Sequence, residues 1–248
     1  MGALKMKYTQ LLSINSDTKT SKGTKYGYLT GILYLAPAKI SGRNFCPNAS
    51  EGCASACLYS AGRGKFSNVQ QARIKKSRYF IEHRDEFMLN LINSIEKLIR
   101  KAKRENLIPV VRLNGTSDIA WENIKINNYG YNQSIFELFS DVQFYDYTKS
   151  IKRATANYKY GKKIIPNYHL TFSQSESNFS AVLNLVDLYK AVNVAVVFDK
   201  LPSKYLGRTV INGDLSDLRF KDTEGVIVGL VAKGDAKKDN SNFVVRGV

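Results

Sequence analysis

The chain has 248 residues, of which 44% are hydrophobic and 23% are charged, and this composition indicates a folded globular protein rather than a disordered one. No apolar run approaches the ~18 residues that span a bilayer, and no apolar segment follows the first lysines, so we expect a cytoplasmic protein without a membrane or export segment. Lysine and arginine number 37 against 21 acidic residues, a net charge of +16 that favours nucleic acid or another polyanion as a partner.

The first predicted element is a strand at residues 28–35, because this stretch (YLTGILYL) is rich in β-branched and aromatic residues and ends at Ala36-Pro37. A loop rich in Gly, Asn and Ser follows at residues 39–65. It holds all three cysteines of the chain, with six residues between Cys46 and Cys53 and three between Cys53 and Cys57. An odd, clustered set of cysteines is a poor disulfide framework.

Three thiolates in one loop select a soft metal, which is either zinc or the iron of an iron–sulfur cluster. Structural zinc sites usually take four ligands and favour closely paired cysteines, whereas His83 and His169 are remote in sequence from this loop. We therefore predict a [4Fe–4S] cluster with one iron left open by the cysteines, and zinc is the alternative.

Two consecutive helices are predicted over residues 68–104, where apolar residues recur at three- and four-residue spacing, with a break near His83-Arg84-Asp85. Short apolar strands then alternate with amphipathic segments. The strands lie at residues 108–118, 142–150, 168–177, 192–200, 209–217 and 225–234. This alternation predicts a single α/β domain over residues 1–248, with about seven mostly parallel strands in a full or partial (β/α) barrel. An open doubly wound sheet is the alternative.

Polar residues follow five of these strands and should meet at the carboxyl edge of the sheet, where sites form in barrels and open sheets alike. Such residues also end strands simply because they make turns and cap helices. The polar tails are Asn114, Thr116, Ser117 and Asp118; Asp146, Thr148 and Lys149; Ser173, Gln174 and Ser175; Asp199 and Lys200; Asn212 and Asp214.

Several segments resemble the phage-encoded gene-product-eighty-eight family over nearly the whole chain. They are CLYSAGRGKF, VVRLNGTSDI, FYDYTKS, YHLTFSQSES, VINGDLSDLRFKD and GVIVGLVAKG. The layout is also similar to radical S-adenosylmethionine enzymes, in which a cysteine loop after the first strand of an α/β barrel holds a [4Fe–4S] cluster. This similarity implies that Cys46, Cys53 and Cys57 are cluster ligands, and a phage origin implies the host cytoplasm. It implies a cofactor site at Asn114, Thr116, Ser117, Asp118, Ser173 and Ser175.

Three functions follow from these residues. The first is a radical S-adenosylmethionine-like enzyme, whose substrate pocket we place at Tyr145, Asp146, Lys149, Asp199 and Asp214, with Ser173 beside them. The second is a nucleic-acid-binding module that a cluster or zinc stabilises without catalysis. Its contacts would be Arg63, Lys65, Arg73, Lys75, Lys76 and Arg78, with the aromatic residues Tyr59, Phe66 and Tyr79 interleaved. The third is a Mg²⁺-dependent hydrolase that uses Asp118, Asp146, Asp199 and Asp214.

Overall fold

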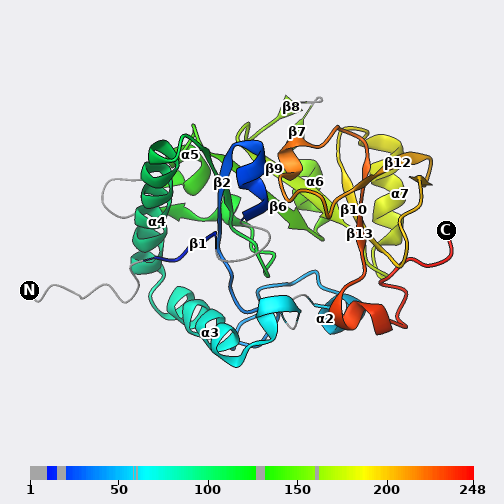
Figure 1. Cartoon of the computed structure of the whole chain (residues 1–248), viewed down its shortest axis with the longest axis horizontal. Coiled ribbons are helices and arrows are strands. Elements are labelled where there is room, and N and C mark those ends of the chain that lie inside the picture. The colour runs from blue at the N-terminus through cyan, green and yellow to red at the C-terminus, as the bar shows by residue number, and fades with distance from the viewer. Residues whose placement is uncertain (1–9, 16–20, 58, 60, 127–131, 160–161) are drawn as a thin grey trace, which may run out of the picture.

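A nine-stranded sheet forms the centre of the molecule (Figure 1). The computed structural model describes residues 10–15, 21–57, 59, 61–126, 132–159 and 162–248. Seven strands run parallel to their neighbours, and the remaining two, β1 (Ser13–Ile14) and β11 (Lys204–Tyr205), pair antiparallel at the two edges. In order across the sheet, the parallel strands are β2 (Tyr28–Ile32), β3 (Ile108–Arg112), β6 (Gln143–Thr148), β9 (Tyr168–Ser173), β10 (Val194–Phe198), β13 (Ile227–Val231) and β12 (Arg208–Asn212).

The parallel sheet and its seven strands confirm the α/β prediction, and each predicted strand overlaps one of them. The closed barrel is wrong, because β1 and β11 form free edges and the sheet stays open. The structure is compatible with the open sheet that the sequence analysis gave as the alternative. Periodicity shows where strands lie but carries no information on whether the first and last of them pair.

The helices connect the parallel strands, which need long crossovers rather than tight turns. Two of them, α3 (Ser67–Glu82) and α4 (Arg84–Arg104), confirm the predicted pair, and the chain leaves helical geometry only at His83. Shorter helices are α2 (Glu51–Ser55), α5 (Ile135–Leu138), α6 (Ile151–Ala156) and α7 (Phe179–Leu188), with 3-10 turns η1 (Gly23–Tyr26), η3 (Gly62–Lys65), η4 (Trp121–Asn123), η5 (Arg219–Lys221) and η6 (Gly234–Lys238). Two small hairpins complete the fold, β4–β5 (Lys125–Ile126 and Gln133–Ser134) and β7–β8 (Tyr158–Lys159 and Lys162–Lys163).

One face of the sheet, here called the helix-covered face, holds the main apolar core. Val111, Phe144 and Tyr168 are in register on neighbouring strands and pack in one cluster with Leu91 and Ile95 of α4. Farther along the sheet, Phe172 and Val194 are also in register and pack against Val182 and Leu185 of α7. All these side chains are at most 1% exposed, so this face supplies most of the apolar burial that stabilises the fold.

The opposite face, here called the polar face, carries the residues that alternate with that core. They are Arg112, Tyr145, Tyr147, His169 and Thr171, which must point away from the helices because successive side chains of a strand alternate. Residues 214–222, which include η5, lie over this face. Arg112 Nη1 is 3.1 Å from both carboxylate oxygens of Asp217, and the Tyr145 hydroxyl donates to Asp217 Oδ2 at 3.1 Å.

In the described part of the chain, no helix combines the length and the apolarity that crossing a membrane requires. Residues 1–9, on which the expected absence of an export segment rests, lie outside the described residues.

Candidate metal centre at the carboxyl edge of the sheet

The cysteine loop is fixed to the end of β9 by one carboxylate. The Gly52 amide donates to Glu176 Oε1 at 2.7 Å, and the Ser50 hydroxyl donates to Glu176 Oε2 at 2.8 Å. The Ser50 hydroxyl also accepts from the Cys53 amide at 3.2 Å and so caps α2. A Cβ on Gly52 would lie 2.1 Å from Ser241 Oγ and 2.8 Å from Glu176 Oε1, so a larger residue would push these side chains away.

A second attachment fixes the start of the loop to the end of β3. Phe45 packs in the main core, and its carbonyl accepts from the Asp118 amide at 2.8 Å. The adjacent Cys46 Sγ lies 3.8 Å from the Thr116 carbonyl. The Thr116 hydroxyl in turn donates to the Leu35 carbonyl at 2.5 Å, which joins the ends of β2 and β3. The loop is therefore attached at the ends of β3 and β9.

The three thiols interact with one another electrostatically. Burial raises the pKa of the Cys46 thiol to about 11, and Cys57 and Cys53 raise it further. Burial also raises the pKa of Cys57, with Cys53 adding to the shift. None of the three forms a disulfide, and each is half-buried. Their present spacing is not that of a complete metal site, because no three His, Cys, Asp or Glu residues among those described lie close enough together to hold an ion.

Two cations act on the thiols. Both Arg73 and Lys149 lower the pKa of Cys57. Lys149 Nζ donates to the Ser173 hydroxyl at 2.8 Å and lies 5.4 Å from the ring centroid of Phe243. Arg73, only 8% exposed, lies 4.8 Å from the ring centroid of Tyr34. Partly buried cations beside the thiols favour a bound anionic group, and an iron–sulfur cluster held by three thiolates is one.

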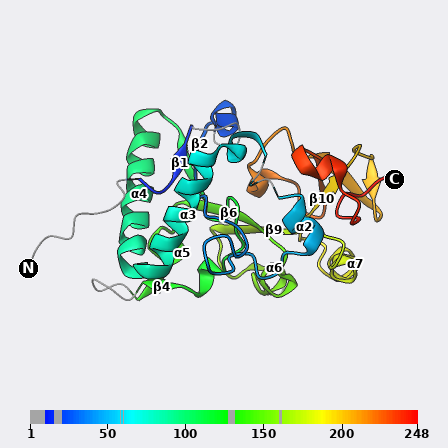
Figure 2. The same ribbon diagram turned by 90° about the horizontal axis from the view of Figure 1, so that it is seen from below.

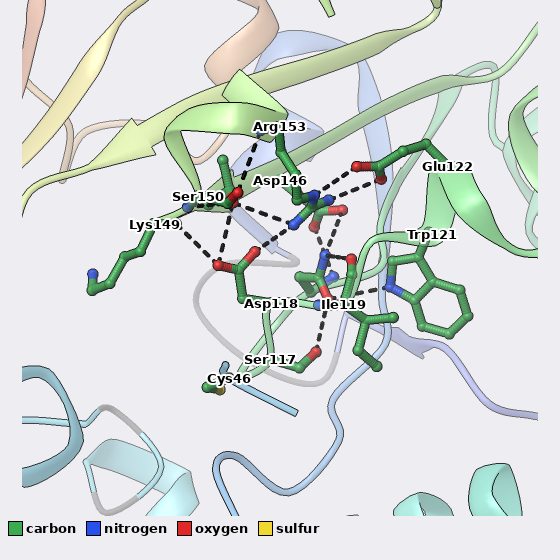
Figure 3. Close-up of polar contacts among 12 residues, drawn as sticks. Cys46, Ser117, Asp118, Ile119, Trp121, Glu122, Asp146, Lys149, Ser150 and Arg153 are labelled. Carbon is green, nitrogen blue, oxygen red and sulfur yellow. Dashed lines mark hydrogen bonds and ion pairs between the residues drawn. The ribbon is translucent and has the colours of Figure 1, made fainter. Parts of the chain in front are cut away.

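Behind the thiols, the strand ends form a buried polar network (Figure 3). Asn114 is its centre: its amide N–H donates to Asp146 Oδ1 at 2.7 Å, and its Oδ1 accepts from the Ser117 hydroxyl, the Ile119 amide and the Trp121 ring N–H. Asn114 is 2% exposed, so it organises the turn after β3 rather than facing a ligand.

Asp118 is also engaged within the protein. One of its oxygens pairs with Arg153, and the other accepts from the Thr148 hydroxyl at 3.2 Å and from the Lys149 amide at 3.0 Å. Arg153 bonds Glu122 as well, at 2.6 Å from its Nε. Of the predicted cofactor residues, Asn114, Ser117 and Asp118 thus belong to this network.

Of the other three predicted cofactor residues, Thr116 bonds the Leu35 carbonyl, Ser173 ends β9 and Ser175 follows it. Ser173 accepts from Lys149 and lies on the polar-face side, next to the thiols. Ser175 is buried, with its amide donating to Asn178 Oδ1 at 2.7 Å and its hydroxyl 3.3 Å from that of Ser177. Ser173 is therefore the one of these two serines that is linked to the thiols, through Lys149, which acts on Cys57.

The predicted substrate residues do not converge. Tyr145 and Asp146 are consecutive in β6 and point to opposite faces, with Tyr145 on the polar face and Asp146 in the network of Figure 3. Asp199 is exposed, and Asp214 pairs with Lys233 at a different strand end. Only Lys149 lies beside the thiols. The four carboxylates of the Mg²⁺ alternative likewise lie at different places in the fold. Among the described residues, no three His, Cys, Asp or Glu side chains are close enough together to hold a metal ion.

The predicted nucleic-acid residues divide into two groups. Arg63, Lys65, Lys75 and Arg78 are exposed. Arg73 is buried beside the thiols, and Lys76 donates to the Leu11 carbonyl at 3.3 Å while burial lowers its pKa to about 8. Helical periodicity does not reveal this division, because α3 buries a polar side between the core and the cysteine loop.

Sequence reasoning missed Glu176 and Arg153, which hold the cysteine loop and the strand-end network in place. Both follow predicted strands, and no local pattern marks either as a partner of residues more than 30 positions away.

Comparison with known proteins gives one finding. The family model described as Gene product 88 matches residues 6–247. Neither the curated proteins nor the solved structures contain a match.

Proposed function

The chain belongs to the Gene product 88 family, and from that premise we propose that its three cysteines bind an iron–sulfur cluster at the carboxyl edge of the sheet. The observation that carries the proposal is that one loop, fixed at two strand ends, supplies three half-buried thiols that are not in disulfides. Arg73 and Lys149 beside Cys57 supply positive charge for an anionic group.

The donor set fits a cluster better than a structural zinc ion. Thiolates are the usual protein ligands of iron–sulfur clusters, and zinc would need a fourth ligand. His169 does not supply it, because it is buried within β9 on the polar face and is only 3% exposed. Binding would draw the thiols closer together than they now lie, with the loop ordering as it binds.

The finer form of the proposal is a radical S-adenosylmethionine-like activity. A cluster with one open iron can supply an electron to that cofactor when it is bound. The residues of this chain that border such a site are Lys149 and Ser173, which are hydrogen-bonded to each other beside the cysteine loop. Asn114 and Asp118 are held by Asp146 and Arg153, and they would support the site by fixing the turn after β3.

The test is elemental analysis of protein purified without oxygen. We expect a brown protein with iron and sulfide in similar amounts, and single Cys→Ser changes at Cys46, Cys53 or Cys57 should each lower both. Stoichiometric zinc without sulfide would overturn the proposal and favour the zinc alternative.

The finer form has a separate test. Reduced, cluster-loaded protein should convert S-adenosylmethionine to methionine and 5′-deoxyadenosine, and Lys149→Met should weaken binding of this cofactor while iron and sulfide stay at the parent level. A loaded protein that shows no cofactor binding by calorimetry rejects the enzyme and leaves the cluster as a structural element.

A further inference from the structure

The C-terminal segment meets the end of the cysteine loop, from which it is distant in sequence. Gly234, at the start of η6, approaches Ala61 so closely that a Cβ on it would lie 3.2 Å from the Ala61 Cβ. Ala56, which ends α2, packs with Ala232 and Ala236 in one apolar cluster. Both views show α2 beside the C-terminal segment that contains η6, on the side of the molecule where α3 lies (Figures 1 and 2). Residues 61–65 and 232–246 therefore border α2 and its cysteine together.

The exposed cations of these segments include Arg63 and Lys65 on η3, Lys237 and Lys238 on η6, and Arg246 near the C-terminus. Lys233 is also exposed but pairs with Asp214, so it is left out of the set. We call this set the cationic collar. Arg246 donates to the carbonyls of Lys237 (3.1 Å) and Asp239 (3.3 Å), which ties the C-terminal segment to η6. The collar differs from the basic set predicted on α3, because Arg73 and Lys76 are turned inward and η6 replaces them.

Acidic side chains on the same segments only partly offset the collar. Asp239 is turned into the chain, where its carboxylate accepts from the Ser241 hydroxyl at 2.5 Å and from the Val244 amide at 3.0 Å. Glu51 and Asp235 line a hollow of about 310 Å³ between α2 and η6, with Lys238 on its rim. The collar thus remains positive and lies on a chain whose total net charge is +16.

An exposed aromatic ring adjoins the collar. Phe66 directly follows Lys65 and is 53% exposed, although the chain buries most of its large apolar side chains. Exposed aromatic rings between cations are the combination that binds single-stranded nucleic acid, because bases stack on the ring while the cations contact phosphates. Duplex DNA keeps its bases stacked inside and would leave this ring unused.

We propose that the cationic collar binds single-stranded nucleic acid, with a base stacked on Phe66 and the backbone passing beside the cysteine loop. This inference goes beyond the cluster proposal and does not depend on it, since no collar residue is a thiol or a neighbour in the strand-end network. It assigns the expected polyanionic partner to a defined surface.

The first test is a salt titration of the affinity for a fluorescent oligothymidylate, measured by polarisation. Replacing Lys65 and Lys237 together with Ala should reduce the salt slope by about 0.7 unit per lost phosphate contact. The matched control replaces Lys103 and Arg104 with Ala. These two residues are also exposed, but they lie at the C-terminal end of α4 and are not part of the collar. Equal slopes for the two double variants, or no binding by the parent, would overturn the proposal.

The second test separates stacking from charge. Phe66→Ala should weaken binding of the single strand by about tenfold, and Phe179→Ala, which removes a 43% exposed ring from α7, should leave it unchanged. Duplex bound as tightly as the single strand would contradict the proposal. Iron and sulfide are measured on the same samples. If the collar variants keep the iron and sulfide content of the parent, their weaker binding is due to the changed surface. If the protein has no cluster but still binds through the collar, only the cluster proposal is refuted.

Discussion

The two faces of the sheet use the same strands for different purposes. On the helix-covered face, Phe144 and Tyr168 are completely buried in an apolar cluster that runs under α4. On the polar face of the same two strands, Tyr145 and His169 face the charged segment around Asp217. Burial of apolar side chains stabilises a fold without requiring a specific bonding partner, whereas a buried charge lowers stability unless it is paired. The helix-covered face therefore supplies most of the apolar stabilisation, and the polar face carries charges that must be paired.

The largest expected effect is on the helix-covered face. Phe144→Ala removes a fully buried ring and should lower the free energy of unfolding by about 4 kcal/mol, because it leaves a cavity as well as losing apolar burial. Urea denaturation measures this loss. The control is Phe179→Ala, whose ring is 43% exposed and which should change stability by less than ~1 kcal/mol. Similar losses for both would contradict the assignment of the core to this face.

The next effect is on the polar face. Asp217→Leu leaves the Arg112 guanidinium buried without its carboxylate and should cost about 3 kcal/mol by the same measurement. Adding Arg112→Met to this variant removes the charge as well and should recover most of the loss. A double variant as unstable as the single one would show that the ion pair makes a net contribution to stability, beyond offsetting the cost of burying its two charges.

Most of the fold could be predicted from the sequence, because runs such as VAVVF at β10 and the three- and four-residue spacing of α3 and α4 are local signals. The position of the cysteine loop directly after the first predicted strand could also be read from the sequence. The pocket did not, because Tyr145 and Asp146 were placed together although alternation puts them on opposite faces. The pairing of Arg112 with Asp217, 105 residues apart, has no local signal at all.

A smaller effect is expected where the cysteine loop joins β9. Glu176→Ala removes the acceptor for the Gly52 amide and the Ser50 hydroxyl and should destabilise the loop by about 2 kcal/mol. Hydrogen exchange of the Gly52 amide should speed up about thirtyfold, since ~1.4 kcal/mol corresponds to tenfold. Glu82→Ala, at an exposed position of α3, is the control. Unchanged exchange at Gly52 would mean that the carboxylate does not hold the loop.

The pH dependence of stability compares one carboxyl from each side of the sheet. Burial raises the pKa of Asp146 to about 7 in the strand-end network and that of Asp222 to about 6 near the polar face. Both groups bind a proton more tightly when folded than unfolded, so their contribution to stability is present below about pH 4 and is lost as the pH rises through these values.

Each group should contribute a slope of at most ~1.4 kcal/mol per pH unit within its window. Urea denaturation from pH 4 to pH 7 measures the slope of the parent, and Asp146→Asn should remove the part that extends toward about pH 7. Asp222→Asn should remove the part that ends near about pH 6. A slope that is unchanged in both variants would show that neither carboxyl titrates in this range.

The most direct test of the central claim is a Mössbauer spectrum of the anaerobic protein grown on ⁵⁷Fe. Three thiolates from Cys46, Cys53 and Cys57 predict a [4Fe–4S] cluster in which one iron differs from the other three, and adding S-adenosylmethionine should change the signal of that iron alone. A spectrum of isolated iron ions, or protein that binds zinc and gives no cluster signal, would contradict the account.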